Sequence, residues 1–170
     1  MKFVRASRDG IINQESIEKA LDIDTRLVSL MLVNNETGTI QPVGKTGERV
    51  KEFAEKSGRR IHFHTDAVQG FGKIPFHPSD MNIDSATISA HKLSGPRGVG
   101  ALFLRKNCPL TPIYRGGEQE MGFRPGTENL PAIAGFALAA QRARASMDKN
   151  FATARKLISF LIEGDRKSVV

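Results

Sequence analysis

Residues 83–104 read IDSATISAHKLSGPRGVGALFL, and this stretch decides the fold class of the 170-residue chain. Its first six residues, Ile83–Ile88, predict a strand, the glycine-rich segment 95–98 predicts a turn, and Val99–Leu104 predicts a second strand. Lys92 stands between the first strand and the turn. Because open α/β sheets place their ligands at the carboxyl ends of strands, Lys92 is well placed to reach one.

The rest of the chain alternates between apolar runs of strand length and segments with helical spacing. The expected strands are Leu27–Val33, Ile61–Ala67 and Ile83–Ser89, and the expected helices are Ser16–Leu21, Thr46–Lys56 before Gly58, and Pro131 to about Ile162. In the last of these, the polar stretch 148–150 is a candidate break. This alternation predicts an α/β fold with a mostly parallel sheet flanked by helices.

Composition indicates a folded, soluble chain of one domain's length, with 39% hydrophobic and 25% charged residues. The sequence has no apolar run of about 18 residues, and its amino terminus lacks the pattern of a signal peptide, so we expect a cytoplasmic protein without membrane association. The single cysteine, Cys108, excludes an internal disulfide framework.

The formal net charge of +7 is compatible with nucleic-acid binding, but its distribution argues against that function. Much of the excess is interspersed with acidic residues on the last predicted helix, and one tyrosine without tryptophan offers little for base stacking. The basic residues concerned are Arg142, Arg144, Lys149, Arg155, Lys156, Arg166 and Lys167. We therefore expect a solvated helix face and no nucleic-acid partner.

Three groups of polar residues follow predicted strands. They are Asn34-Asn35-Glu36, then Asp66 with Gln69, then Ser89 with His91 and Lys92. In a parallel sheet these positions line one edge and can surround one ligand. Taken separately, each group has an ordinary explanation as a loop, a turn or a solvated lysine.

A carboxylate and a lysine in one pocket suit pyridoxal phosphate. A buried Asp66 would keep the pyridine nitrogen protonated, and Lys92 would carry the aldehyde as a Schiff base. Ser89 and His91 could hold the phosphate together with backbone N–H groups.

The ordered motifs resemble those of the pyridoxal-phosphate cysteine desulfurases of the NifS/IscS type, within the class-V aminotransferase family. The resemblance runs from about Val4 to about Ala140 and includes the spacing between motifs. The motifs are NNETG (34–38), HTDAVQ (64–69), SAHK (89–92) with GPRGVG (95–100), and GGEQE (116–120) with RPGTEN (124–129).

This resemblance implies that Lys92 is the catalytic residue and forms the internal aldimine. Asp66 would pair with the pyridine nitrogen and Gln69 with the phenolic oxygen, while Asn35 resembles an amide near that oxygen and the substrate.

The phosphate of the cofactor would have ligands from two places in the chain. Ser89 and His91 resemble its ligands within one subunit. Thr127 resembles a threonine that reaches the phosphate of the neighbouring subunit, which implies a homodimer.

The implied reaction converts L-cysteine to L-alanine and leaves persulfide sulfur on a protein thiol, for transfer to an acceptor or to a scaffold for iron–sulfur clusters. The Arg124–Thr127 segment, with Pro125 in place of a frequent serine, also resembles selenocysteine lyases, so L-selenocysteine is an alternative substrate. Ala90 and Glu118 stand where glycines are common, which is tolerable unless the backbone there needs a positive φ.

The resemblance further implies that residues 1–140 are part of the large, cofactor-binding domain of a fold-type I enzyme, and that 141–170 lead towards an absent small domain. A phosphate loop and a ring-stacking histidine would precede Met1, and the nucleophilic cysteine and a carboxylate-binding arginine would follow Val170. Cys108 does not match that nucleophile. We expect the chain alone to bind the cofactor weakly and to turn over no cysteine.

Two other interpretations remain open from the sequence. His62, His64 and Asp66 alternate, so they share one face of a strand and could bind the metal of a hydrolase, with His77 or His91 as a further ligand. Alternatively, the chain is a non-catalytic fragment that acts at most as a partner in a complex.

Overall fold

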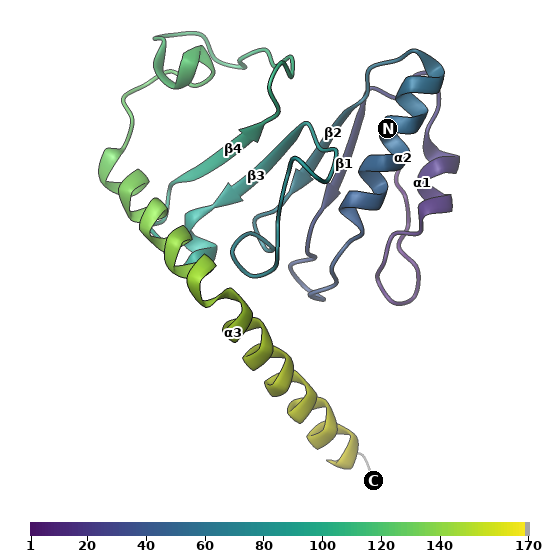
Figure 1. Ribbon diagram of the computed structural model, residues 1–170, viewed down its shortest axis with the longest axis vertical. Helices are drawn as coiled ribbons and strands as arrows, with labels where there is room; N and C mark the ends of the chain where they lie inside the picture. The colour runs from purple at the N-terminus through teal and green to yellow at the C-terminus, as the bar shows by residue number, and fades with distance from the viewer. Residues whose placement is uncertain (169–170) are drawn as a thin grey trace.

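The computed structural model describes residues 1–168, with side chains up to residue 165, as a sheet with helices packed on it (Figure 1). The helices are α1 (Gln14–Ala20), α2 (Val43–Ser57) and α3 (Leu130–Ser168), and the strands are β1 (Leu27–Met31), β2 (His62–Asp66), β3 (Ser85–Ser89) and β4 (Gly100–Leu104). Two short 3₁₀ helices, η1 (Ala90–Leu93) and η2 (Gln119–Gly122), follow β3 and β4.

The four strands form one sheet in the order β1-β2-β3-β4. β1, β2 and β3 run parallel, whereas β4 runs antiparallel to β3. The link between β3 and β4 contains only η1 and a turn, which is too short for the crossover that a parallel pair needs. The predicted α/β class with a mostly parallel sheet is therefore confirmed.

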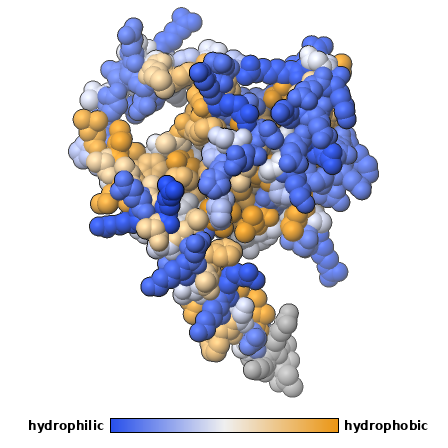
Figure 2. Space-filling view, in the orientation of Figure 1, coloured by the Kyte–Doolittle hydropathy of each residue, from blue (hydrophilic) through white to orange (hydrophobic). Residues whose placement is uncertain are grey.

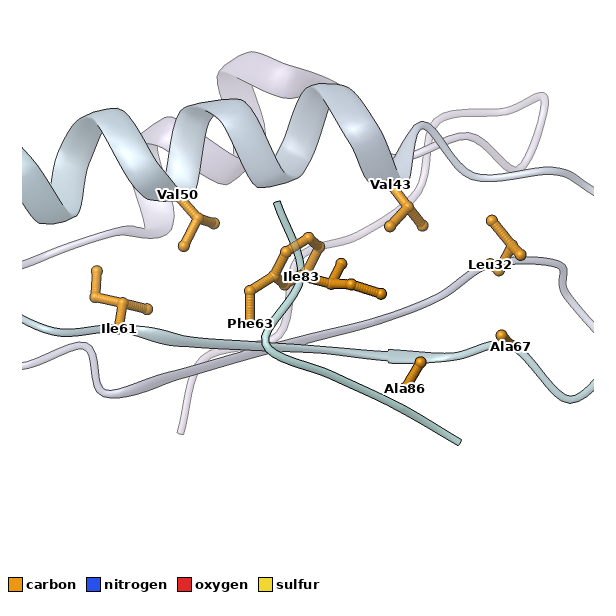
Figure 3. Close-up of a cluster of buried hydrophobic side chains, with 8 residues drawn as sticks. All are labelled: Leu32, Val43, Val50, Ile61, Phe63, Ala67, Ile83 and Ala86. Carbon is orange, nitrogen blue, oxygen red and sulfur yellow. The ribbon is translucent and has the colours of Figure 1, made fainter. Parts of the chain in front are cut away.

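The hydrophobic core lies between one face of the sheet and α2. Val43 and Val50 of α2 face Phe63 and Ile83, both of which are fully buried (Figure 3). The core also contains Leu32, Ile61, Ala67 and Ala86. Helix α2 ends at Gly58, which has a φ of 64°. Glycine adopts this left-handed conformation easily because it has no Cβ, so the predicted helix end at Gly58 is confirmed.

On the opposite face of the sheet, the two central strands β2 and β3 carry polar side chains, between apolar residues of β1 and β4. Side chains alternate along a strand, so His62, His64 and Asp66 of β2 lie on the face away from Phe63. Ser85 is paired with His64 and Thr87 with Asp66 in the register of β3. These polar side chains and the hydrophobic core therefore lie on opposite faces of the same strands.

Helix α3 begins at Leu130, where Asn129 Oδ1 accepts a hydrogen bond from the N–H of Ala132 at 3.2 Å. It continues without interruption through the polar stretch 148–150, so the candidate break there was wrong. This stretch contains neither Gly nor Pro, and the Asn150 amide donates to Ser146 Oγ one turn earlier, at 3.1 Å.

The first part of α3 contacts η1, whereas residues 151–165 are exposed along their whole length. Figure 2 shows hydrophobic side chains gathered on this outer half of the helix. Those exposed are Phe151, Leu157, Ile158, Phe160, Leu161 and Ile162. Despite the length of α3, none of the described helices is apolar enough to cross a membrane.

Candidate functional site

The carboxyl ends of β1, β2 and β3 bring the predicted polar groups to one edge of the sheet. Met31, the last residue of β1, is paired with Asp66, the last residue of β2. Asp66 is in turn paired with Thr87, two residues before the end of β3 at Ser89. Asn34, Asp66 and Ser89 therefore follow or end neighbouring strands, as the sequence predicts.

Asp66 is half-buried, and one of its carboxylate oxygens is held by the chain that follows it. Its Oδ1 accepts the N–H of Val68 at 2.9 Å, which fixes the side chain at the strand end. Gln69, also half-buried, follows in the same turn and accepts a hydrogen bond from the ammonium of Lys73 at its Oε1, at 3.2 Å. The carboxylate and the amide are thus oriented by contacts within the segment 66–73.

Ser89 and His91 lie beside each other at the end of β3. Ser89 Oγ and His91 Nδ1 are 2.7 Å apart. When the imidazole N–H donates to Oγ, the hydroxyl proton of Ser89 remains free to donate to an anion. This pair can therefore act as a phosphate ligand.

Lys92 lies in η1, and its side chain is exposed. It lines a pocket of about 600 Å³ together with Lys73 and, from α3, Leu138 and Arg142. A second pocket, of about 470 Å³, lies between the first four residues, α1 and β1, and none of the predicted site residues lines it. Of the predicted site residues, Lys92 is the one that lines the larger pocket, whereas Asp66, Gln69, Ser89 and His91 lie outside its lining.

Close packing of η1 on α3 holds the Lys92 turn in place. A Cβ on Gly135 of α3 would lie 2.7 Å from the ring of Pro96, and a Cβ on Gly95 would lie 3.1 Å from Ala139. These glycines let helix and turn approach more closely than side chains permit. The Phe136 ring also packs edge-on against Phe71, with centroids 6.5 Å apart, which joins α3 to the segment after Asp66.

Two predicted site residues, Asn35 and Thr127, make no contact with the other predicted site residues in the hydrogen bonds described above. Asn35 is exposed in the loop after β1, while its neighbour Asn34 caps that loop by accepting the N–H groups of Glu36 and Thr37, both at 2.9 Å. Thr127 is exposed just before α3 begins, whereas Gly95 and Pro96, in the turn after η1, contact α3 further along, at Ala139 and Gly135. A role for Thr127 in another subunit stays a prediction.

The alternative of a metal face on β2 is not supported. His62 Nε2 and His64 Nδ1 each lie 2.7 Å from Ser85 Oγ, so both imidazoles are engaged by one serine instead of converging with Asp66. Among the described residues, no group of three or more His, Cys, Asp or Glu side chains is placed to hold a metal ion. Burial lowers the pKa of His64, and the neighbouring His62 lowers it further, against the opposing effect of Asp66.

Cys108 lies at the other end of β2, half-buried, with Sγ 3.5 Å from His62 Nδ1. Burial raises the pKa of this thiol, and the charge of Asp84 raises it further, although Arg60 and Arg105 oppose the shift. A raised thiol pKa reduces the thiolate fraction at neutral pH. Cys108 thus has the character of a packing cysteine.

The two departures from the glycine pattern cause no backbone strain. Ala90 and Glu118 are both absent from the positions with positive φ, which include Ser94, Glu120 and Met121. Ala90 is fully buried under the Lys92 turn.

The sequence comparisons identify the family. The model of the class-V aminotransferases matches residues 1–164, so the chain belongs to this family, whose members depend in general on pyridoxal phosphate. The chain is 40% identical to the cysteine desulfurase IscS of Methanosarcina thermophila and 39% identical to that of Dictyoglomus turgidum. It is covered to 95% and 98% in these matches but spans only 39% and 41% of the two relatives.

Solved structures give the same result. A NifS-like protein superposes with a TM-score of 0.89 at 41% identity, over 98% of this chain and 44% of the other. DndA from Streptomyces lividans superposes with a TM-score of 0.84 at 40% identity, over 96% and 46%. SspA, solved in complex with cysteine, does so with a TM-score of 0.74 at 39% identity, over 82% and 39%.

One residue near the candidate site, Lys73, was not predicted from the sequence. Lys73 contacts Gln69 and shares the pocket of Lys92. Lys73 follows Gln69 by four residues, a spacing that predicts a side-chain contact in a helix. The segment between them has the sequence of a turn, however, and in a turn this spacing predicts no contact.

Proposed function

We propose that this chain carries the cofactor-lysine part of a pyridoxal-phosphate-dependent cysteine desulfurase. The single observation that carries the proposal is that Asp66 and Ser89 end neighbouring parallel strands, with Lys92 three residues after Ser89. It is supported by the similarity to IscS and NifS-like proteins.

The residues at this edge fit the chemical groups of the cofactor. Asp66 offers a fixed carboxylate for a protonated pyridine nitrogen, and Gln69 offers an amide for the phenolic oxygen. Ser89 and His91 offer donors to the phosphate, and Lys92 offers a primary amine for the aldehyde.

When bound, pyridoxal phosphate supplies a protonated ring that takes up the electron pair released at the substrate Cα. Lys92 would hold the aldehyde of the cofactor through its side-chain amine. The Lys92 amine, carried by η1 directly after β3, could also accept the proton from the substrate Cα. Asn35 lies in the loop at the same edge and is proposed to contact the substrate.

We propose that the substrate sulfur is transferred to a thiol other than that of Cys108. The Cys108 thiol is unsuited to this role because it is half-buried and its pKa is raised. We propose L-cysteine as the substrate, with L-selenocysteine as the alternative that Pro125 leaves open, and a scaffold or carrier protein as the acceptor. The proposed compartment is the cytoplasm.

The proposed domain assignment follows from the share of the relatives that is matched. Residues 1–140 are proposed to be part of the large domain, and 141–170, of which 141–168 belong to α3, are proposed to lead towards a small domain. Thr127 is proposed to reach the cofactor of a second subunit in a homodimer, because it is exposed in its own chain.

The test compares the 170-residue chain with a longer protein, made by joining the chain to the segments of the Dictyoglomus turgidum IscS that it does not cover. Both are mixed with pyridoxal phosphate, and the visible absorbance of lysine-bound cofactor is recorded for the wild type and for Lys92→Ala. We expect this absorbance in the wild type, weaker in the short chain, and none in Lys92→Ala.

Release of alanine and sulfide from cysteine is then measured with both proteins. We expect turnover by the longer protein alone. Lysine-bound absorbance that persists in Lys92→Ala, or a longer protein inactive on both cysteine and selenocysteine, would contradict the proposal.

A further inference from the structure

We infer that Lys73 is a positioning residue that orients the side-chain amide of Gln69, so that its Nε2 donor faces the ligand site. This inference rests on the proposed function, in which Gln69 meets the phenolic oxygen of the cofactor. It assigns a role to a residue outside the motif that carries Asp66 and Gln69.

The argument starts from the chemistry of the two side chains. A glutamine amide has an accepting oxygen and a donating nitrogen on the same carbon, so the direction of one fixes the direction of the other. Lys73 Nζ is a donor only, and it lies 3.2 Å from Gln69 Oε1. The oxygen of Gln69 is therefore turned towards Lys73, which leaves Nε2 free to donate elsewhere.

A phenolic oxygen requires this orientation because it accepts hydrogen bonds when it is ionised. With the amide reversed, the oxygen of Gln69 would face the phenolic oxygen and repel it. Lys73 thus selects the one orientation of Gln69 that suits the proposed ligand.

The backbone of Lys73 is held firmly enough for this role. Gly72, the preceding residue, has a φ of 71°, and a Cβ there would lie 2.8 Å from Leu93 and 2.9 Å from Ala143. The turn is therefore clamped between η1 and α3. Inside it, the Lys73 N–H donates to Gly70 O at 3.0 Å.

The surroundings of the ammonium favour the same contact. Burial lowers the pKa of Lys73, and the charge of Lys92, which lines the same pocket, lowers it further. Although Lys73 is exposed overall, this partial loss of water makes an acceptor close to its ammonium more favourable. Gln69 Oε1 is such an acceptor, four residues earlier in the chain.

The first measurement needs no cofactor. The side-chain amide resonances of Gln69 are recorded by ¹⁵N NMR in the wild type, Lys73→Met and Lys73→Arg, with Gln69→Ala to assign them and Lys51→Met of α2 as the matched control. We expect Lys73→Met to shift these resonances, Lys73→Arg to retain most of the wild-type position because it still donates, and Lys51→Met to leave them unchanged. Unchanged resonances in a folded Lys73→Met variant would overturn the inference.

The second measurement titrates pyridoxal phosphate into the longer protein and follows its absorbance. Loss of one oriented hydrogen bond should raise the Kd of Lys73→Met by about fivefold. In a Gln69→Ala background the same substitution should change the Kd little, because Lys73 acts through Gln69. An equal effect in both backgrounds would show that Lys73 acts on the ligand directly and would overturn the inference.

The two measurements separate this inference from the proposed function. If the wild type gives no lysine-bound absorbance, the proposed function fails, and the resonances of Gln69 still decide whether Lys73 orients it. If the wild type binds the cofactor and Lys73→Met binds it equally well, the inference fails and the proposed function stands.

Discussion

Gly47 of α2 packs so closely on the chain before β3 that a Cβ there would overlap the carbonyl oxygen of Met81. This contact brings α2 onto the core at Ile83, two residues before β3, and β3 leads directly into the turn that carries Lys92. The position of the candidate site thus depends on a residue without a side chain, far from the site in sequence.

Gly47→Ala is therefore expected to destabilise the protein by roughly 2 kcal/mol, although alanine favours helix, because backbone must move to admit the methyl group. Gly44, also in α2, is the matched control: a Cβ there would make an ordinary contact 3.9 Å from Met81 Cγ. Gly44→Ala should be neutral or stabilising by up to about 1 kcal/mol. Urea unfolding of both variants checks this, and equal stability of the two would contradict it.

The His62–Ser85–His64 group predicts a pH dependence of stability. Since folding lowers the pKa of His64, the unfolded chain binds a proton more readily than the folded chain. The free energy of unfolding should therefore decrease as the pH falls below about 6.5, the ordinary value for histidine, and level off once the folded form is also protonated.

His64→Gln should flatten this profile, whereas His77→Gln, at an exposed position, should keep it. The measurement is urea unfolding of each variant at several pH values between 5 and 8, the range in which histidines titrate. A slope that survives in His64→Gln would show that another group is responsible.

Cys108 is expected to react slowly with iodoacetamide. Its raised pKa leaves less thiolate at neutral pH than a free thiol has, and its half-buried position limits access. Because it is the single cysteine of the chain, the mass of the intact protein reports its alkylation directly. Alkylation as fast as that of glutathione at the same pH would contradict its interpretation as a packing residue.

Much of the fold follows from local sequence patterns. The apolar run Leu27–Val33 predicts a buried parallel strand; β1 does pair in parallel with β2, although none of its residues is fully buried, and parallel strands necessarily bring their carboxyl ends to one edge. For this reason the sequence alone predicts that Asp66, Ser89 and Lys92 lie together. Gly58 likewise ends α2 for a reason that is visible in the sequence.

Other features depend on tertiary contacts that no local pattern contains. The polar stretch 148–150 resembled a helix end, but nothing in it prevents helical hydrogen bonding, and α3 runs through it. The alternation of His62 and His64 predicted their shared face correctly. It could not show that Ser85, on the neighbouring strand, engages both rings.

The most direct test of the central claim is to trap the lysine that binds pyridoxal phosphate. The protein is incubated with the cofactor, reduced with borohydride and digested, and the modified peptides are mapped by mass spectrometry. The account predicts one dominant modified lysine, Lys92, and loss of that peptide in Lys92→Ala. Modification spread over exposed lysines such as Lys51 and Lys106, with none favoured at Lys92, would contradict it.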